Sequence, residues 1–365
     1  MKKSLRVIRV LQIIDTLHTG GAERLAVNYA NGLIKHNVES HLCATRAEGP
    51  LLNSINGNVN YLFLDRKSTF DLKAIFRLRA YVRSHKIDII HAHASSFFIA
   101  TLIKVVVPRV KLIWHDHYGN SEYLDQRPIK VLKWCSSKFS QIFSVNKTLE
   151  SWAKKTLNCD RVTYIKNFPV LKKSDSNLTK LEGKTGKRIL CLANLREQKN
   201  HIRLLEAFKL VKAKYPDWTL HCVGKDFKDD YSKLFFLNLK NHSLENHVYF
   251  YDTKTDILNI LQQSTMAILP SKSEGLPLAL LEYGLAGLPV ICTDVGDCGK
   301  VISDETYGIL LKEEKPDVIA EAISKFIEED EFRINCGKNL NQKVLEEYSE
   351  EAILGDIKQI YLNSI

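Results

Sequence analysis

The segment from residue 266 to residue 294 constrains the fold of this chain more than any other. Its first residues, Met266 to Leu269, form an apolar run with the length of a buried strand. A polar loop containing Glu274 follows, and Pro277 then opens a run of strong helix formers, which suits the fixed φ of proline at a first helical turn. Gly287 and a second proline end this helix, and apolar residues begin another strand. The segment therefore predicts strand, loop, helix and strand, the repeating unit of a parallel α/β sheet.

The loop and helix of this segment carry groups that suit a ligand. In a parallel α/β sheet, ligands bind beyond the carboxyl ends of the strands, where helix N-termini point unpaired amides outward. The loop amides of Gly275 and Leu276 can approach a diphosphate or a sugar hydroxyl, and Glu274 and Glu282 can accept hydrogen bonds from vicinal hydroxyls. An ordinary loop glutamate and an ordinary helix glutamate are the alternative. Because the glycine, the prolines and the strands occur in one block, the pattern favours a ligand site.

Apolar runs alternate with amphipathic stretches along all 365 residues, which predicts an α/β fold with two doubly wound domains. A polar, lysine-rich stretch at 171–187 has no apolar periodicity and is expected to be the linker. We therefore expect an N-terminal domain at 1–170, a C-terminal domain at 188–347 and a final helix at 348–365. In the first half, strands are expected at 7–14, 39–45, 61–64, 87–91, 111–114, 142–145 and 162–165, with helices such as 22–35 and 72–84. In the second half, the final helices are expected at 316–329 and 349–363.

Two motifs give the chain a resemblance to a known family. Glu274-Gly-Leu-Pro-Leu-Ala-Leu-Leu-Glu282 resembles the E-x7-E block of the family 4 retaining glycosyltransferases, and Gly20-Gly21-Ala22-Glu23-Arg24 resembles their N-terminal loop. The resemblance implies the GT-B fold, in which two Rossmann-like domains face each other across a cleft and the last helix crosses back to the N-terminal domain. It also implies that Glu274 contacts the sugar of a nucleotide-diphosphate donor and that Glu282 contacts the nucleotide ribose.

Two further loops are expected to bind the donor. The glycine pair Gly20-Gly21 lies between the first strand and a helix, where backbone amides can approach a phosphate. A loop at the end of a later strand carries Arg196 and Lys199, which can neutralise a diphosphate leaving group. The family usually places its arginine five residues before the lysine, and here Asn194 occupies that position. Lys199 therefore matches the family pattern, whereas Arg196 is displaced by two residues.

Two histidine pairs are expected at strand ends of the first domain. Both His91-Ala-His93 and His115-Asp116-His117 have a spacing that puts the two rings on one side of a strand. Such pairs can bind a metal or take part in acid–base chemistry, although no third ligand is evident in the sequence. The resemblance implies that His115 lies next to the transferred sugar, with His117 as the alternative and His93 in the acceptor pocket. No D-x-D triplet occurs, so we expect neither a metal nor a cofactor.

Charge and cysteine distribution bear on partners and location. The formal net charge is +10 and the sequence pI is about 9.0. Seven basic residues between Arg127 and Lys155 are interleaved with Trp134, Phe139 and Trp152, which suits contact with an anionic membrane surface. No nucleic-acid-binding signature is present, so nucleic acid is not an expected partner. Scattered cysteines and the lack of a long apolar run predict a cytoplasmic protein, and the basic segment adds the expectation of peripheral contact with the inner face of the membrane.

These observations predict a retaining glycosyltransferase that moves a sugar from a nucleotide-diphosphate donor to a hydroxyl acceptor. The expected acceptor is a lipid-linked glycan in bacterial polysaccharide or envelope assembly. Two alternatives stay open at this point: a GT-B nucleotide-sugar 2-epimerase, and a non-catalytic protein that binds a nucleotide-sugar or a lipid surface. The sequence does not distinguish UDP, GDP and ADP donors.

Overall fold

The computed structural model describes residues 7–121, 123–171, 173 and 178–365. These form two compact units. Unit 1 extends to Asn167 and includes Glu350–Ile365, and unit 2 comprises Phe168–Ser349. Residues 1–6 and most of the predicted linker before residue 178 lie outside the described residues.

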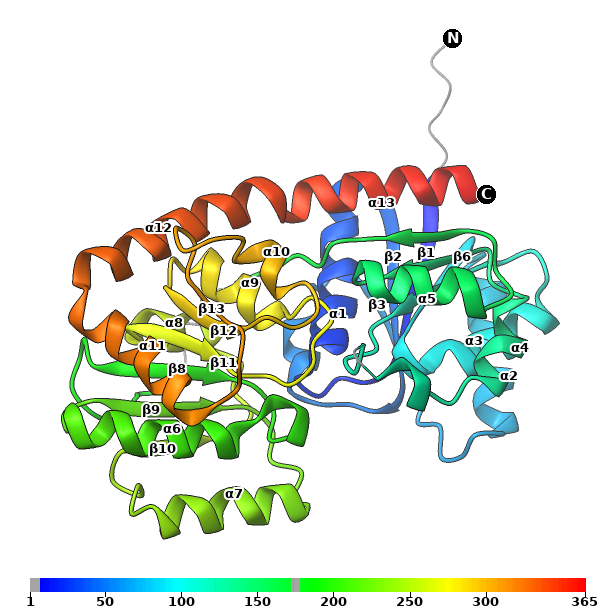
Figure 1. Ribbon diagram of the computed structural model, residues 1–365. Helices are drawn as coiled ribbons and strands as arrows, with labels where there is room; N and C mark the ends of the chain where they lie inside the picture. The colour runs from blue at the N-terminus through cyan, green and yellow to red at the C-terminus, as the bar shows by residue number, and fades with distance from the viewer. Residues whose placement is uncertain (1–6, 122, 172, 174–177) are drawn as a thin grey trace. The chain divides into compact units, whose positions relative to one another are not determined.

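Unit 1 contains a parallel sheet, here called sheet A, with seven strands in the described part of the chain (Figure 1). The strand order is β3-β2-β1-β4-β5-β6-β7. The strands are β1 (Ile8–Thr16), β2 (Val38–Ala47), β3 (Asn60–Phe63), β4 (Ile89–His93), β5 (Lys111–Asp116), β6 (Gln141–Ser144) and β7 (Val162–Tyr164). β4 and β5 extend two residues beyond their predicted ends, so His93 and His115 lie within strands.

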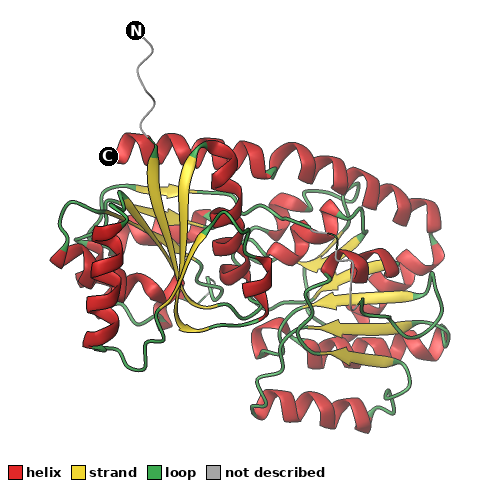
Figure 2. Ribbon diagram, turned by 180° about the vertical axis from the view of Figure 1, so that it is seen from behind, coloured by secondary structure: helices red, strands yellow, loops and turns green. Residues whose placement is uncertain are grey.

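Helices cover both faces of sheet A (Figure 2). One face packs against α1 (Gly21–Leu33) and α13 (Glu350–Ser364). The other face packs against α2 (Leu72–Ser84), α3 (Phe97–Val106), α4 (Lys130–Ser136) and α5 (Lys147–Thr156). The apolar cluster between these four helices and the sheet includes Leu78, Ile103, Leu112, Leu132 and Ala153. Apolar burial of this kind fixes each helix against its strands.

Unit 2 contains a second parallel sheet, sheet B, with the order β10-β9-β8-β11-β12-β13. Its strands are β8 (Arg188–Leu192), β9 (Thr219–Val223), β10 (Val248–Tyr251), β11 (Met266–Leu269), β12 (Val290–Thr293) and β13 (Ile309–Leu311). Its helices are α6 (His201–Lys214), α7 (Asp230–Asn241), α8 (Ile257–Gln263), α9 (Leu278–Leu285), α10 (Cys298–Val301), α11 (Pro316–Glu328) and α12 (Asp330–Glu347). The prediction of two doubly wound α/β sheets is therefore confirmed.

One helix of unit 2, α12, was missing from the predicted end of the chain. Of its residues, Cys336, Gly337, Leu340 and Val344 are buried, so a long polar sequence carries only a narrow apolar stripe. Such a stripe gives a weak periodic signal. α13 follows it, and its residues Ile353, Leu354, Ile357 and Tyr361 are buried within unit 1.

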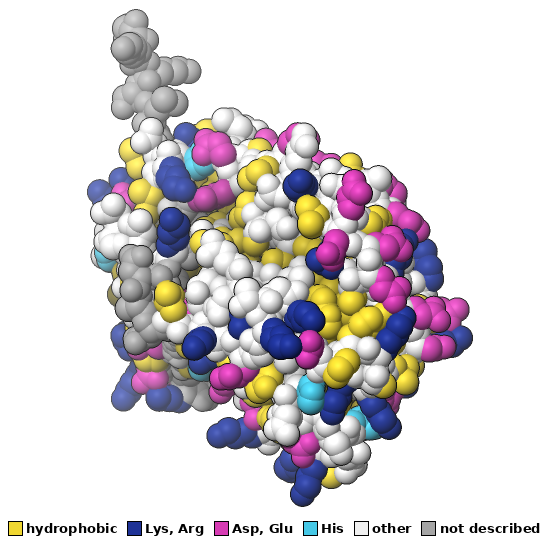
Figure 3. Space-filling view, turned by 90° about the vertical axis from the view of Figure 1, so that its left-hand side faces the viewer, with side chains coloured by type: hydrophobic (Ala, Val, Ile, Leu, Met, Phe, Trp, Pro, Cys, Tyr) yellow, Lys and Arg dark blue, Asp and Glu magenta, His cyan; other side chains and the backbone are white. Residues whose placement is uncertain are grey.

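Charged side chains of both signs lie on the face of the molecule shown in Figure 3, and the cysteine thiols are buried. On the face seen in Figure 3, lysine and arginine side chains are interspersed with aspartate and glutamate side chains. All eight cysteines are free and buried, as expected for thiols that pack as small apolar groups. Within the described ranges, no helix combines the length and the apolar character needed to cross a bilayer.

Candidate functional site

In each sheet, the strand order reverses between two neighbouring strands. These are β1 and β4 in sheet A, and β8 and β11 in sheet B. Doubly wound sheets bind their ligands beyond the carboxyl ends of the strands at such a reversal. In unit 1, Gly20, Gly21 and His93 follow or end these strands, and in unit 2, Asn194, Lys199 and Glu274 follow them. The two groups of predicted residues therefore occupy the expected edges.

In unit 2, the structure brings Lys199 and Glu274 together from opposite sides of the reversal. The Lys199 Nζ donates to Glu274 Oε1 at 2.6 Å, and both side chains are largely buried. Glu274 is followed by Gly275 and the buried Leu276, which lead into α9. A cation and a carboxylate that are desolvated together interact more strongly than a surface pair. The pair therefore fixes the strand-end loops in one arrangement.

Groups that were not predicted hold the Glu274 loop. The Ser271 hydroxyl donates to Glu274 Oε1 at 2.6 Å, and the Thr293 hydroxyl donates to the Ser271 carbonyl at 2.5 Å. Gly296 has φ +56° and leaves no room for a side chain, because a Cβ there would lie 2.2 Å from the Glu274 carbonyl oxygen. The next residue, Asp297, donates its backbone N–H to the Gly275 carbonyl at 2.8 Å. The Val-Gly-Asp turn after a predicted strand is the sequence signal that could have identified this support.

The second glutamate of the predicted motif lies within α9. Glu282 is buried, with 4% of its surface exposed, on the same helix whose N-cap position is Pro277. No side chain caps this helix N-terminus, so its first backbone amides are available to an anion or a hydroxyl. The two glutamates of the motif thus flank an uncapped helix end.

The remaining predicted cation, Arg196, is exposed and stacks on an aromatic ring. Its guanidinium lies 4.4 Å from the Phe227 ring centroid, and the Lys225 Nζ lies 5.2 Å from the same ring. Asn194, which occupies the position of the family's arginine, forms a local hydrogen bond: its Oδ1 accepts the backbone N–H of Lys225 at 2.8 Å. Asn194 therefore joins the ends of β8 and β9, whereas Arg196 and Lys225 are the charged groups beside them.

In unit 1, Gly20 and Gly21 begin α1 as predicted. Gly20 is the N-cap residue and makes no side-chain cap. The Glu23 carboxylate folds back over this position, since a Cβ on Gly20 would lie 2.2 Å from its Oε2. The positive end of the helix is thus approached by a carboxylate of the same helix, and a bound phosphate would have to displace it.

The four predicted histidines lie on the face of sheet A that α1 and α13 cover. Cross-strand pairing places His93 beside His115. The His91 and His93 rings are stacked, with centroids 4.4 Å apart. The His115 and His117 rings are tilted by 31° to each other, with centroids 4.2 Å apart. His91, His93 and His115 are fully buried, and His117 at the carboxyl edge is partly exposed. The burial of His115 favours His117 as the member of this cluster that meets a ligand.

Burial determines the charge state of these rings. Desolvation lowers the pKa of His91, His93 and His115 well below the usual value, and it lowers the pKa of His117 to about 3. All four are therefore neutral at physiological pH. Nitrogens of His91, His93 and His115 lie within 4.8 Å of one another, so the structure supplies the third potential metal ligand that was not evident in the sequence. The planes of the His91 and His115 rings differ by 9°.

A buried ion pair supports the loop after His117. Arg127 donates two hydrogen bonds to Asp116, at 2.7 and 2.8 Å, and its guanidinium lies 4.3 Å from the Tyr118 ring and 4.5 Å from the Trp152 ring. This arrangement corrects part of the predicted membrane surface. Arg127 is paired in the interior, Phe139 is buried in the core, and Trp152 covers Arg127.

What stays exposed in the predicted basic segment is one side of α4. Val131 and Trp134 are each 54% exposed, and Lys130, Lys133 and Lys138 are exposed beside them. On α5, by contrast, Lys147 and Lys154 form ion pairs with Glu150 at 2.7 and 2.8 Å. The segment therefore presents a short basic and apolar helix face on α4, and in its second half Glu150 offsets part of the positive charge.

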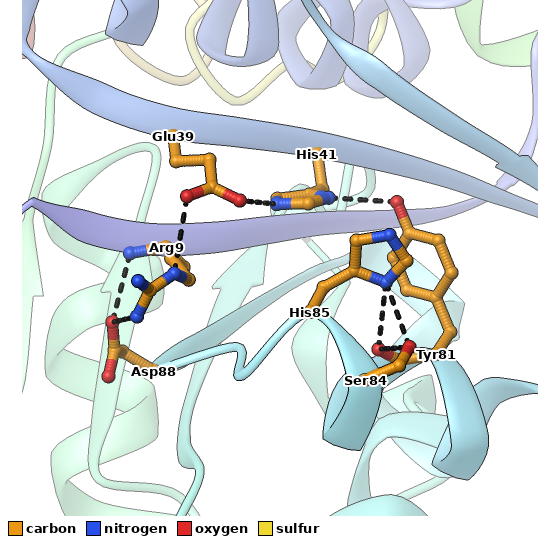
Figure 4. A network of polar contacts seen from close by, with 7 residues as sticks. All are labelled: Arg9, Glu39, His41, Tyr81, Ser84, His85 and Asp88. Atoms are coloured by element: carbon orange, nitrogen blue, oxygen red, sulfur yellow. Dashed lines mark hydrogen bonds and ion pairs between the residues drawn. The ribbon is translucent and has the colours of Figure 1, made fainter.

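A second network of ionisable groups lies at the amino edge of sheet A (Figure 4). His41 Nδ1 and the Tyr81 hydroxyl are 2.8 Å apart, and His41 Nε2 lies 3.3 Å from Glu39 Oε1. Arg9 donates its Nε–H to Glu39 at 3.2 Å and its backbone N–H to Asp88 at 3.0 Å. This network could not be predicted from the sequence, because it joins segments that are far apart in the chain.

Comparisons with known proteins identify relatives over nearly the whole chain. Residues 19–169 match the model of Glycosyltransferase Family 4, and residues 172–343 match that of Glycosyl transferases group 1. An Escherichia coli protein named UDP-Gal:α-D-GlcNAc-diphosphoundecaprenol α-1,3-galactosyltransferase is 24% identical, and the alignment covers 100% of this chain and 99% of that protein. An uncharacterised glycosyltransferase of Haemophilus influenzae is also 24% identical, and the alignment covers 95% of this chain and 98% of that protein. The structure of HepE from Anabaena with UDP and glucose has a TM-score of 0.80 at 17% identity, covering 98% of this chain and 100% of that one.

Proposed function

This chain belongs to the family 4 glycosyltransferases and has their GT-B fold, and from that premise we propose that it transfers a sugar, with retention of configuration, from a nucleotide-diphosphate donor to a lipid-linked glycan. We propose a UDP-sugar as donor, because one relative is named for UDP-galactose and a solved structure of another glycosyltransferase of this fold contains UDP. The diphosphoundecaprenol in the name of the same relative supports a polyprenyl-diphosphate acceptor and a role in bacterial polysaccharide or envelope assembly.

The buried pair of Lys199 and Glu274 is the observation that carries this proposal. Lys199, with Arg196 in the same loop, neutralises the charge that develops on the leaving diphosphate. Glu274 accepts hydrogen bonds from hydroxyls of the donor sugar, and Glu282 accepts those of the ribose. The uncapped N-terminus of α9 adds backbone amides for the same ligand. With these fixed donors and cations, transfer needs no metal.

In unit 1, we assign His117 to the acceptor side. Its ring is partly exposed, and its lowered pKa keeps it neutral, so it acts as a hydrogen-bonding group and carries no charge. His93 orients this ring through the 3.0 Å hydrogen bond between His93 Nδ1 and His117 Nε2. His115 stacks between its neighbours and contributes packing.

The test is a transfer assay with UDP-, GDP- and ADP-sugars, a polyprenyl-diphosphate glycan acceptor, and reactions with and without EDTA. We expect product from UDP-sugars only, in equal amounts with EDTA, and an α-configured product from an α-configured donor. Conversion of the donor sugar without acceptor would support the epimerase alternative. Binding of UDP-sugar without any turnover would contradict the proposed enzyme and leave a binding protein.

We also propose that the exposed face of α4 contacts an anionic membrane surface. Lys130 and Lys133 attract the headgroups, and Val131 and Trp134 enter the interface. Replacing both lysines with glutamine is expected to weaken binding to phosphatidylglycerol vesicles by about 2 kcal/mol, or about thirtyfold, at low salt. Lys154→Gln is the matched control, because this lysine is already paired with Glu150. Equal vesicle binding by all three proteins would refute this role of α4.

A further inference from the structure

Two residues that the sequence did not mark, Gln12 on β1 and Tyr361 on α13, connect the histidines into one chain of hydrogen bonds. His117 Nε2 lies 3.0 Å from His93 Nδ1, and His93 Nε2 lies 2.8 Å from Gln12 Oε1. The Gln12 Nε2 donates to the Tyr361 hydroxyl at 3.5 Å, the longest of these contacts. The Tyr361 hydroxyl in turn lies 2.6 Å from His91 Nδ1.

The orientation of the Gln12 amide fixes the direction of the hydrogen bonds that connect Gln12, His93 and His117. Because Gln12 Oε1 can only accept, the proton of His93 must reside on Nε2. His93 Nδ1 is then an acceptor, so His117 must donate from Nε2. At the other end, Tyr361 accepts from Gln12, and its own proton is available to His91 Nδ1.

This direction determines what His117 offers at the carboxyl edge of sheet A. With the proton on Nε2, its Nδ1 carries a lone pair, and this atom has no hydrogen-bond partner among the described residues. A neutral imidazole in this tautomer can accept a hydrogen bond at Nδ1 and cannot donate one there. The opposite tautomer would present a donor at the same place.

We propose that Tyr361, acting through Gln12 and His93, is a positioning residue that keeps the His117 proton on Nε2 and thereby presents Nδ1 as the acceptor for a substrate hydroxyl. The assignment to a substrate hydroxyl rests on the proposed function, whereas the tautomer itself does not. The residue that sets this state lies on α13, which belongs to unit 1 although it follows unit 2 in the chain.

Loss of the Tyr361 hydroxyl removes the acceptor that the Gln12 amide group faces. The amide can then rotate by 180° and donate from Nε2 to His93 Nε2. His93 must then carry its proton on Nδ1 and donate it to His117 Nε2, so His117 carries its own proton on Nδ1. Each ring exchanges one N–H for the other, so no charge changes. The substitution Tyr361→Phe changes the packing little, because phenylalanine keeps the aromatic ring in place.

The test is nitrogen NMR of the ligand-free, full-length protein labelled with ¹⁵N-histidine, in which protonated and unprotonated ring nitrogens have well-separated shifts. His117→Gln identifies the His117 signals among those of the 12 histidines. We expect wild-type His117 to be protonated at Nε2, and Tyr361→Phe to move a large fraction of the proton to Nδ1. Tyr81→Phe is the matched control, because it removes a hydroxyl 2.8 Å from His41 Nδ1 in the separate network of Figure 4.

A wild-type signal from Nδ1–H, or an unchanged His117 tautomer in Tyr361→Phe, would overturn the inference. If Tyr361→Phe does not fold, Gln12→Met decides, since it breaks the same chain on another element and should shift the same proton. In transfer assays, Tyr361→Phe should lower kcat/KM by about fivefold, roughly the worth of one hydrogen bond, with Tyr81→Phe unchanged. The expected tautomer in a protein without transferase activity would leave this inference standing and refute the proposed function alone.

Discussion

The two edges of sheet A carry similar side chains in different states. At the amino edge, His41 has a partner on both ring nitrogens, and Glu39 accepts from both His41 and Arg9. At the carboxyl edge, neither ring nitrogen of His115 has a hydrogen-bond partner in the described structure, and the same holds for Nε2 of His91. A buried polar atom without a partner costs on the order of 1–3 kcal/mol. Polar groups are therefore hydrogen-bonded at the amino edge, whereas buried ring nitrogens at the carboxyl edge carry a desolvation cost that no hydrogen bond in the described structure offsets.

The largest expected effect separates the charged pairs of the two edges. Arg127→Met leaves the buried carboxylate of Asp116 without its cation, and we expect it to lower the free energy of unfolding by about 3–5 kcal/mol. Arg9→Met, at the amino edge, should cost about 1 kcal/mol or less, because Arg9 is 31% and Glu39 40% exposed. Urea denaturation followed by tryptophan fluorescence measures both. Adding Asp116→Asn should restore part of the loss in Arg127→Met, and equal effects of the two arginine substitutions would remove the distinction between the edges.

The next effect concerns catalysis. Glu274→Gln keeps the shape of the side chain and removes its charge, so Lys199 loses its carboxylate partner and the proposed contact with the donor sugar is weakened. We expect kcat to fall by about 10²–10³-fold, as for other preorganised polar groups at a reacting centre. Glu39→Gln is the control with the same chemical change at the amino edge. Transfer rates for the two variants should differ by at least tenfold, and a similar loss in both would mean that Glu274 acts through folding alone.

The sequence predicted what depends on local pattern. Strands, the Pro277 helix start and the glutamates of the E-x7-E block follow from apolar periodicity, turn residues and a motif with fixed spacing. The histidine pairs were correctly placed on one side of their strands for the same reason. What could not be predicted depends on pairing between distant segments. Gln12 looks like a lone polar residue in an apolar strand, and only the packing of α13 shows that it meets Tyr361.

The burial of individual side chains could not be predicted from the sequence either. Trp134, Phe139 and Trp152 look alike as aromatics among basic residues, but one is exposed, one lies in the core and one covers a guanidinium. His115 and His117 are likewise equivalent by pattern, and their difference arises because β5 ends at Asp116 and leaves only His117 beyond the strand. Exposure at a strand end depends on where the strand ends and on which helices cover it. The two-residue spacing of His115 and His117 does not determine either.

The smallest expected effect tests that distinction between the two histidines. His115→Leu replaces a buried ring that has no hydrogen-bond partner in the described structure, so at pH 7 we expect the free energy of unfolding to rise by about 1 kcal/mol and transfer activity to persist. His41→Leu should cost about 1 kcal/mol or more, because the Tyr81 hydroxyl loses its partner and Glu39 keeps only Arg9. Full loss of activity in a stable His115→Leu protein would place His115 at the reacting centre, as the family resemblance implied.

The same variant gives a second readout as pH falls. The folded state holds His115 neutral because burial lowers its pKa, whereas the unfolded chain protonates it below about pH 6.5. The unfolded state then binds more protons, so stability decreases as pH falls below that value, by up to about 1.4 kcal/mol per pH unit for each such histidine. His115→Leu should therefore flatten the slope measured between pH 6 and pH 4 by the share of one histidine. Its stability relative to wild type should rise as the solution is acidified, and an unchanged slope would show that His115 takes up a proton in the folded state.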